Sequence, residues 1–309
     1  MKSKRGYLDI SFGLIFGIVV GIIILGLAIY ATIKFITSEQ TVIDVKTSKE
    51  IGILLNPLET GFETGKTNSL IMPVETRFYN KCKIEGIFGE QGIQVQQKSF
   101  NKWTNTNLEI NFPNKYIFSE SMIEGEKFLL FSKPFEFPFK VGDVITMTSY
   151  DTKYCFVNAP ENIAEELGRL QQENIATENC EDKGGFVKVC FSSGDCDINV
   201  NYNSKYVERE GEKVYFEGDA LMYGAIFSDK ETYECELKRL IKRMGVLSLL
   251  YKDKAVFIAR ANCNSNLNPD LLVFGSMAGS YSNSLNLGSF NTLKEEMERK
   301  NGVADCKLW

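Results

Sequence analysis

The sequence contains no histidine, and this absence removes several kinds of chemistry at once. Without imidazole the chain cannot build a Ser-His-Asp or Cys-His nucleophile, and it lacks the ligand that most zinc sites in proteins use. No two cysteines form a C-x-x-C pair, the spacing that zinc knuckles and thioredoxin-like redox sites use. We therefore expect a protein that is not an enzyme and that needs neither a metal nor a cofactor.

An excess of basic charge is also missing. The chain has 35 Lys and Arg against 40 Asp and Glu, so it lacks the basic surface that a phosphate backbone attracts. We therefore expect no nucleic acid among its partners. No Asn-x-Ser/Thr triplet occurs in spite of abundant asparagine, so the sequence predicts a protein free of conventional N-glycans.

A long apolar run near the N-terminus is the most distinctive segment that is present. The 24 residues from Ile10 to Ile33 carry no charge. As a helix they span roughly 36 Å, which is enough to cross a membrane. A secretory signal has a shorter apolar run before its cleavage site, so we interpret residues 10–36 as a retained membrane helix. Membrane lipid is therefore an expected partner.

Orientation of this helix follows from the charges and cysteines on its two sides. Three basic residues, Lys2, Lys4 and Arg5, lie in the leader formed by residues 1–9 and favour a cytoplasmic N-terminus. All eight cysteines follow the apolar run, in even number, as expected for disulfide bonds in an oxidising compartment. The eight are Cys82, Cys155, Cys180, Cys190, Cys196, Cys235, Cys263 and Cys306. We therefore expect a single-pass protein of the cell membrane with residues 61–309 outside the cytoplasm, although eight reduced thiols in a cytosolic chain are the alternative.

Three glycines in the apolar run are spaced four residues apart, at Gly13, Gly17 and Gly21. This spacing places them on one face of a helix, where small side chains let a second helix approach closely. The pattern predicts self-association through the membrane helix. Glycine is common in membrane helices, so chance is an equally good explanation of the pattern.

The basic leader that ends in Lys4-Arg5-Gly6, followed directly by a long apolar helix, resembles the class III signal of archaeal type IV pilins and related surface proteins. The resemblance covers about the first 35 residues only. It implies that a prepilin peptidase cuts after Gly6 and leaves Tyr7 as the mature N-terminus of an assembling helix. Bacterial relatives carry a glutamate at the fifth mature position, where this chain has Ser11. An uncut signal anchor is therefore the alternative.

The remaining chain predicts an α+β fold with three parts. Residues 37–60 continue a helix-compatible pattern as a stalk, until Asn56-Pro57 blocks it. Residues 61–227 contain many short β-type runs, which predict an antiparallel β-rich region, and residues 228–309 are predicted to be mainly helical. Four phenylalanines around two prolines in residues 131–143 are predicted to be buried rather than to form a binding patch.

Two local predictions concern how cysteines pair. The runs GGFVKVCF and CDINVNY are predicted to form a hairpin, which puts Cys190 and Cys196 on opposite faces and leaves them unbonded to each other. Residues 229–259 have the spacing of one long helix, along which Cys235 and Cys263 are roughly 42 Å apart, so each must pair elsewhere. Lys238, Arg239 and neighbouring basic residues on this helix are predicted to form a solvated face.

The sequence thus predicts a membrane-anchored cell-surface protein with a structural or interaction role and a surface partner that it does not identify. One alternative is a pilin-like filament subunit processed after Gly6. The other is a surface hydrolase that uses paired carboxylates, which would require two acids in a shared cleft and a raised pKa for one of them. Sequence spacing does not identify such a pair.

Overall fold

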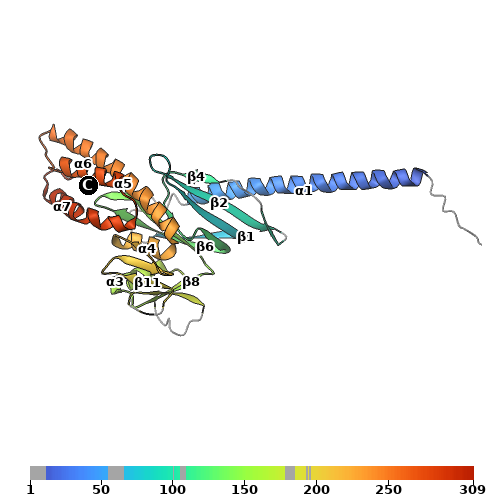
Figure 1. Ribbon diagram of the computed structural model, residues 1–309, viewed down its shortest axis with the longest axis horizontal. Coiled ribbons are helices and arrows are strands. Elements are labelled where there is room, and N and C mark those ends of the chain that lie inside the picture. Colours follow the sequence, from blue (N-terminus) through green and yellow to red (C-terminus); the bar gives the residue numbers. More distant parts are fainter. Residues whose placement is uncertain are drawn as a thin grey trace, which may run out of the picture.

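A single long helix leads into the folded body of the protein. The computed structural model describes residues 12–54, 66–99, 101–104, 109–177, 185–192, 194 and 196–309, with the backbone alone over residues 36–54, 66 and 67. Helix α1 (Phe12–Leu54) runs continuously for 43 residues, from the apolar run into the expected stalk. Its N-terminal part extends away from the body (Figure 1). The predicted processing site at Gly6 and Tyr7 lies outside the described residues.

The first sheet is built largely from two long, bent strands and their neighbours. Its strands are β1 (Lys66–Lys83), β2 (Glu90–Ser99), β3 (Lys102–Trp103), β4 (Ile110–Phe112), β5 (Ile117–Phe118), β6 (Met122–Glu136) and β7 (Lys140–Ser149). The order is β3-β2-β1-β6-β7-β5, with β4 also paired to β2. All these pairs are antiparallel, as predicted for this region, except the parallel pair of β5 and β7.

The second sheet mixes parallel and antiparallel pairs. Its strands are β8 (Lys153–Val157), β9 (Ile175–Ala176), β10 (Phe186–Cys190), β11 (Ile198–Asn201), β12 (Tyr206–Arg209) and β13 (Glu212–Tyr215), in the order β13-β12-β11-β10-β8-β9. β10 runs parallel to both β8 and β11. The predicted hairpin between residues 184 and 202 is therefore wrong. A hairpin does form around Glu210 and Gly211, where β12 and β13 pair antiparallel.

Helices surround and separate the two sheets. They are α3 (Glu161–Leu170), α4 (Gly218–Phe227), α5 (Lys230–Ala259), α6 (Asn268–Gly279), the 3₁₀ helix η1 (Ser284–Phe290) and α7 (Asn291–Val303). The long helix predicted over residues 229–259 is confirmed as α5. It packs closely on α6, because a Cβ atom on Gly245 would lie only 2.9 Å from the Cβ of Ala278.

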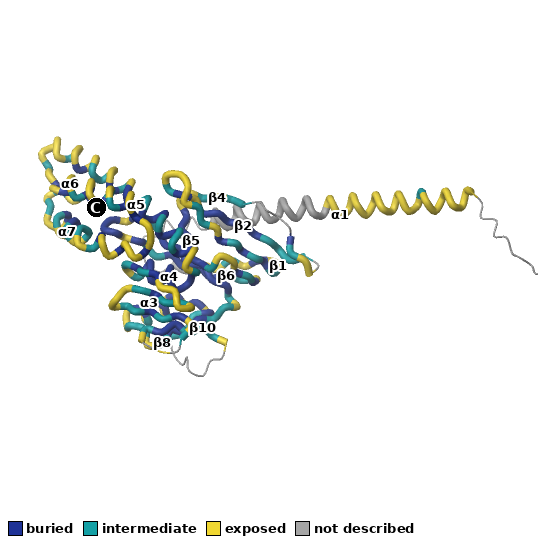
Figure 2. Tube along the Cα trace, viewed as in Figure 1, coloured by how far each residue is buried: buried dark blue, intermediate teal, exposed yellow. Residues whose placement is uncertain are grey.

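Helix α4 forms the centre of the larger hydrophobic core. It contacts β5, β6 and β7 of the first sheet, β12 of the second and helix α5. Every residue from Ala220 to Phe227 is buried, as expected for a helix that is apolar on all sides. Phe131, Phe135, Phe137 and Phe139 are each at most 3% exposed, so the predicted burial of this aromatic segment is confirmed. Burial is concentrated in the body and is nearly absent from the described side chains of α1 (Figure 2).

Candidate functional site

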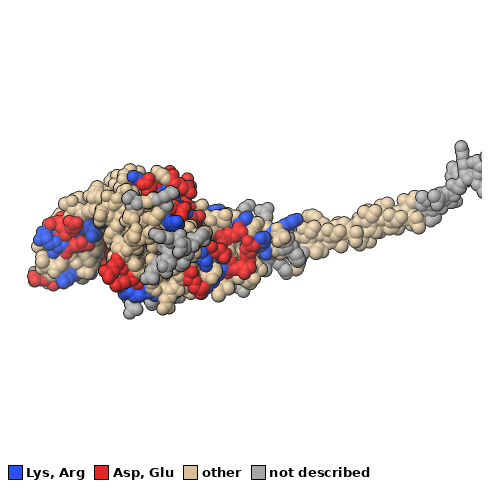
Figure 3. Space-filling model, turned by 90° about the horizontal axis from the view of Figure 1, so that it is seen from below, with Lys and Arg blue, Asp and Glu red and all other residues tan. Residues whose placement is uncertain are grey.

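The N-terminal part of α1 is the clearest feature that the folded body does not explain. Residues Phe12–Phe35 form a 24-residue helical segment, whose most apolar 18 residues have a mean hydropathy of 2.9 and are not buried. Phe12, Leu25 and Phe35 are more than 60% exposed. Lys34 is the one charged residue of this segment. Figure 3 shows most of the exposed rod without charged side chains, whereas acidic and basic side chains are interspersed on the body. By length and composition, this segment can cross a membrane.

The three predicted contact glycines lie in this exposed segment. A Cβ placed on Gly13, Gly17 or Gly21 would meet no atom of the described chain within 4 Å, apart from the backbone of the helix itself and the adjacent residues. Successive members of the set are about 40° apart around the helix axis, so they share one face. No described residue of the chain uses their small size, and the described structure leaves this face open to a second helix.

The opposite end of α1 reaches the body. There the helix lies against β2 and β4 of the first sheet. Helices α5, α6 and α7 lie at the far end of the body from the exposed part of α1 (Figure 1). Because α1 is one unbroken helix, the exposed segment and the part that contacts the sheet have a fixed relation to each other.

Disulfide bonds connect elements throughout the body. Cys82 at the end of β1 is bonded to Cys235 in α5, and Cys263 after α5 is bonded to Cys306 near the C-terminus. Both ends of α5 are thus attached to other elements, as the sequence predicted. Cys190 and Cys196 are bonded to each other, which corrects the prediction that they are not. The reason is that β10 and β11 are parallel, with Val189 opposite Ile198, so the end of β10 lies near the residues that precede β11 and the two cysteines have α-carbons 6.1 Å apart.

Two cysteines remain from the predicted set. Cys155 in β8 is also disulfide-bonded, and Cys180 lies outside the described residues. Disulfides are typical of proteins in oxidising compartments, so their presence is consistent with a body outside the cytoplasm.

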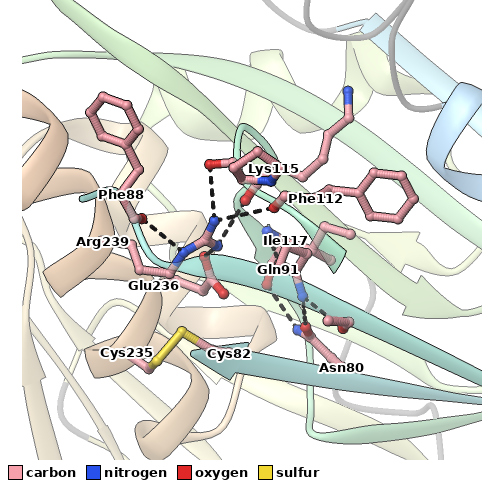
Figure 4. A network of polar contacts seen from close by, with 12 residues as sticks. Asn80, Cys82, Phe88, Gln91, Phe112, Lys115, Ile117, Cys235, Glu236 and Arg239 are labelled. Atoms are coloured by element: carbon pink, nitrogen blue, oxygen red, sulfur yellow. Dashed lines mark hydrogen bonds and ion pairs between the residues drawn. A yellow bond between two sulfur atoms is a disulfide. The ribbon is translucent and has the colours of Figure 1, made fainter. Parts of the chain in front are cut away.

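A buried ion pair lies where α5 crosses the first sheet (Figure 4). Arg239 and Glu236 are both completely buried, and Arg239 Nη1 lies 2.6 Å from Glu236 Oε2. The guanidinium also donates to the carbonyl oxygens of Lys115 (2.8 Å) and Phe88 (3.3 Å), and it lies 4.7 Å from the ring centre of Tyr116. Arg239 is therefore not part of a solvated basic face, and the sequence prediction for this residue is wrong.

The carboxyl group of Glu236 titrates unusually because of its surroundings. Burial raises its pKa to about 8, against the lowering effect of Arg239. Its Oε1 atom has no hydrogen-bond partner among the residues that the structure describes. A raised pKa is typical of catalytic acids, but this carboxyl has no exposed surface for a substrate to reach. Glu236 and Arg239 therefore join α5 to the loops of the first sheet rather than forming an active site.

Beside the ion pair, two amide side chains connect β5 to the opposite strands of the same sheet. Asn80 Nδ2 in β1 donates to the carbonyl oxygen of Ile117 at 2.8 Å, and the Ile117 N–H donates to Gln91 Oε1 in β2 at 3.0 Å. Gln91 also donates to Asn80 Oδ1 (Figure 4). Side-chain amides thus take the place of a backbone ladder, and the sheet curls around a second hydrophobic cluster that contains Phe78, Ile93 and Ile145.

Two carboxylates do come close together elsewhere, at Glu166 in α3 and Asp219 in α4. Both flank the ammonium group of Lys133, at 2.6 Å and 3.6 Å respectively. Tyr223 donates to Glu166 and Tyr202 donates to Asp219, each at 3.0 Å. The lysine and the two hydroxyls occupy these carboxylates, so the cluster resembles a structural ion-pair network more than the acid and nucleophile of a hydrolase.

The sequence indicated the exposed helix and the disulfide-bonded body, but not the buried polar junction. The basic residue that enters the core, Arg239, is next to Lys238 and near Lys242 in the sequence. Helical periodicity gives one signal for the burial of Arg239, because this residue directly precedes Leu240 and so lies at the edge of the apolar face of the helix.

Comparison with known proteins adds no relative to this description. No family model matches the sequence, and neither a curated protein nor a solved structure matches it. The residues of the chain itself therefore have to indicate its function.

Proposed function

We propose that α1 anchors this protein in a membrane and that the body is a structural or interaction module on the outer side. The observation that carries the proposal is the exposed apolar segment Phe12–Phe35. At roughly 25 cal/mol per Å² of apolar surface, leaving such a segment in water is very unfavourable. A bilayer removes this cost, because its hydrocarbon core matches a helix of about 20 apolar residues.

The orientation that we propose puts the N-terminus in the cytoplasm. Basic residues at positions 2, 4 and 5 support it, since basic side chains are enriched on the cytoplasmic side. The disulfides of the body support it as well, because cytosolic thiols are kept reduced. In this orientation the α5–α7 end of the body is the part farthest from the membrane (Figure 1).

A filament subunit processed after Gly6 is the second form of this proposal. The observation that favours it is the continuity of α1, which joins an exposed apolar half to a part that lies against the sheet. Such a helix can associate with copies of itself while each body stays on the outside. The alternative form is an uncut anchor with the same topology.

The first experiment measures the N-terminus and the intact mass of the membrane-extracted protein, alkylated with and without prior reduction. We expect the protein to resist extraction by alkaline carbonate and to be alkylated only after reduction. An N-terminus at Tyr7 would favour the filament form, and Met1 would favour the uncut anchor. A chain that begins beyond residue 35, or eight thiols that react without reduction, would refute the membrane anchor or its orientation.

Self-association through α1 is tested with Gly17→Leu, which replaces the middle glycine of the shared face by a large side chain. We expect this change to weaken association of the helix by about 1–2 kcal/mol in a bilayer. Gly26→Leu is the matched control, because Gly26 is equally open and lies about 180° around the helix from Gly17. Crosslinking in membranes at a series of dilutions measures the effect. Equal association of the two variants would mean that the glycine face is not a contact.

A further inference from the structure

The side chain of Lys133, in β6, lies between two carboxylates that come from different helices. Glu166 belongs to α3, and Asp219 belongs to the first turn of α4. The three side chains are 14%, 19% and 27% exposed, respectively. The Lys133 ammonium also lies 5.4 Å from the centre of the Tyr223 ring. An amine and two carboxyl groups are thus held together in a place that is largely shielded from water.

The two carboxylates contact the lysine in different ways. Both oxygens of Glu166 lie close to Lys133 Nζ, at 2.6 and 2.7 Å, so this carboxylate is placed to exchange protons with the amine. Asp219 Oδ2 lies 3.6 Å from the same nitrogen. The carboxyl group of Asp219 is therefore close to the separation of about 3–3.5 Å at which reacting atoms are held before a bond forms. This geometry favours proton transfer at Glu166 and attack of the nitrogen on the carboxyl carbon of Asp219.

Two tyrosine hydroxyls complete the arrangement. Tyr202 donates to Asp219 Oδ1 at 3.0 Å, and Oδ1 is the oxygen on which negative charge develops when the carboxyl carbon is attacked. Tyr223 donates to Glu166 Oε2 at 3.0 Å and so holds the proton acceptor in place. Burial raises the pKa of both tyrosines, so their hydroxyls keep their protons and remain donors.

We propose that Lys133 and Asp219 join in an internal amide bond between their side chains. The Lys133 ammonium passes a proton to Glu166, and its nitrogen then forms a bond to the carboxyl carbon of Asp219 while Tyr202 stabilises the charge on Oδ1. Glu166 delivers that proton and a second one from the nitrogen to Oδ2. The bond from the carbon to Oδ2 breaks, and this oxygen leaves as water. Glu166 ends as the carboxylate that it was, and no further reactant enters.

The reacting groups all belong to the chain, and this changes what the cluster can do. The contacts that leave no room for an external substrate do not oppose a reaction between side chains that already touch. Amide formation from free ions is unfavourable in water, but groups held in this way react as if the amine were present at a concentration on the order of 10⁵ M. This inference does not depend on α1 being a membrane anchor.

The bond would connect two elements that no disulfide can connect. Neither β6 nor α4 contains a cysteine, so a covalent link between the first sheet and the central helix has to use other side chains. A link of this kind restricts the unfolded chain as a disulfide does, and it also survives reduction. It would give the body a cross-link that resists reducing agents.

A second cluster of the same residue types provides a matched control within the chain. Lys300 Nζ lies 2.7 Å from Asp270 Oδ2 and 3.3 Å from Glu296 Oε1. However, the Glu296 side chain is 40% exposed, and no hydroxyl group among the described residues donates to Asp270. We expect this cluster to remain an ion pair without forming a bond.

Peptide mass spectrometry of the full-length protein tests the proposal after reduction, alkylation and digestion with trypsin. We expect residues 128–140 and 214–230 to be recovered as one branched peptide that is lighter by one water molecule than the two separate peptides. Fragmentation should place the bond between Lys133 and Asp219. Recovery of residues 301–307 as a free peptide should show that Lys300 is unmodified. Two separate, unmodified peptides from the folded wild type, or a bond from Lys133 to Glu166, would overturn the proposal.

Two conservative variants separate the reaction from the ion pairs. Lys133→Arg retains a cation for both carboxylates but should give no branched peptide, because the guanidinium stays protonated and is not a nucleophile. Glu166→Gln retains the size of the side chain and removes the proton acceptor. We expect its linked fraction, measured at the same time after synthesis, to fall about 10-fold or more. Thermal melting checks that both variants are folded. An undiminished linked fraction in folded Glu166→Gln would refute the role of Glu166.

Discussion

Residues 12–33 of α1 and residues 220–227 of α4 are both apolar around the whole circumference of the helix, yet the two stretches occupy opposite environments. In α4 every residue from Ala220 to Phe227 is buried between two sheets and α5. In α1 the segment Phe12–Phe35 is exposed along its length. A helix that is apolar on all sides must be covered, either by protein or by lipid. The body supplies its own cover for α4 and none for this part of α1, so the two helices need different partners to be stable.

Lysine substitutions in the two helices test this difference, and the largest effect is expected in α4. Ile226→Lys puts an ammonium group into the core at a position with no exposed surface. We expect a loss of stability of at least about 5 kcal/mol, because a buried unpaired charge adds to the lost apolar packing. Circular dichroism should then show no cooperative melting of the body. Ile226→Val is the control and should cost only about 1 kcal/mol.

The disulfides provide the next largest effect, and they act on the body alone. Loop-closure entropy predicts a loss of about 5 kcal/mol when the Cys82–Cys235 bond, which spans 153 residues, is removed by double serine substitution. For Cys190–Cys196, which spans 6 residues, the same relation predicts about 2 kcal/mol. Denaturant unfolding of the two double variants measures the order. The reverse order would show that native packing, rather than chain entropy, determines what these bonds contribute.

Lysines in α1 should leave the stability of the body unchanged. Ile22, Ile23 and Ile24 are each more than 50% exposed, so replacing all three by Lys removes no contact within the body. In a bilayer each lysine near the helix centre costs about 3 kcal/mol. We expect the triple variant to be released by alkaline carbonate and to melt at the wild-type temperature. A lowered melting temperature would mean that the body does cover this segment.

A smaller effect concerns the pH dependence of the body. Burial raises the pKa of Glu236 in the folded protein to about 8, whereas an unfolded chain has a glutamate pKa of about 4.3. The folded state therefore holds this proton more tightly, so the stability from Glu236 is full below about pH 4 and is lost as the pH rises through about 8. Melting temperatures between about pH 5 and pH 9 should fall less steeply in Glu236→Gln.

The glutamine in this variant still offers an oxygen to Arg239, which separates the effect of titration from the loss of the hydrogen bond. Glu231→Gln is the matched control, because Glu231 is exposed in the first turn of the same helix. If wild type and Glu236→Gln had parallel pH profiles, the carboxyl would have to be ionised throughout, as in a fully formed ion pair.

Sequence periodicity and composition correctly predicted the features that depend on local residue patterns. The exposed apolar helix, the long helix α5 and the burial of the phenylalanines around Pro134 all follow from local patterns. The parallel direction of β10 and β11 did not follow, because nothing between Cys190 and Cys196 distinguishes a hairpin turn from a loop that restarts a parallel strand. Burial of Arg239 depends on carbonyl groups more than 120 positions away in the chain, which local spacing cannot reveal.

The unbroken course of α1 also has a consequence for motion. A helix of 43 residues is about 64 Å long, and α1 has no described break between the exposed segment and the sheet. A flexible linker would let the body tumble freely above a bilayer, whereas a rigid rod makes the body rotate and tilt with the helix. A tilt of about 20°, usual for a membrane helix, would then swing the far end of the body sideways by tens of ångströms. The range of orientations of the body would thus be determined by the tilt of α1 in the lipid rather than by flexible loops of the body.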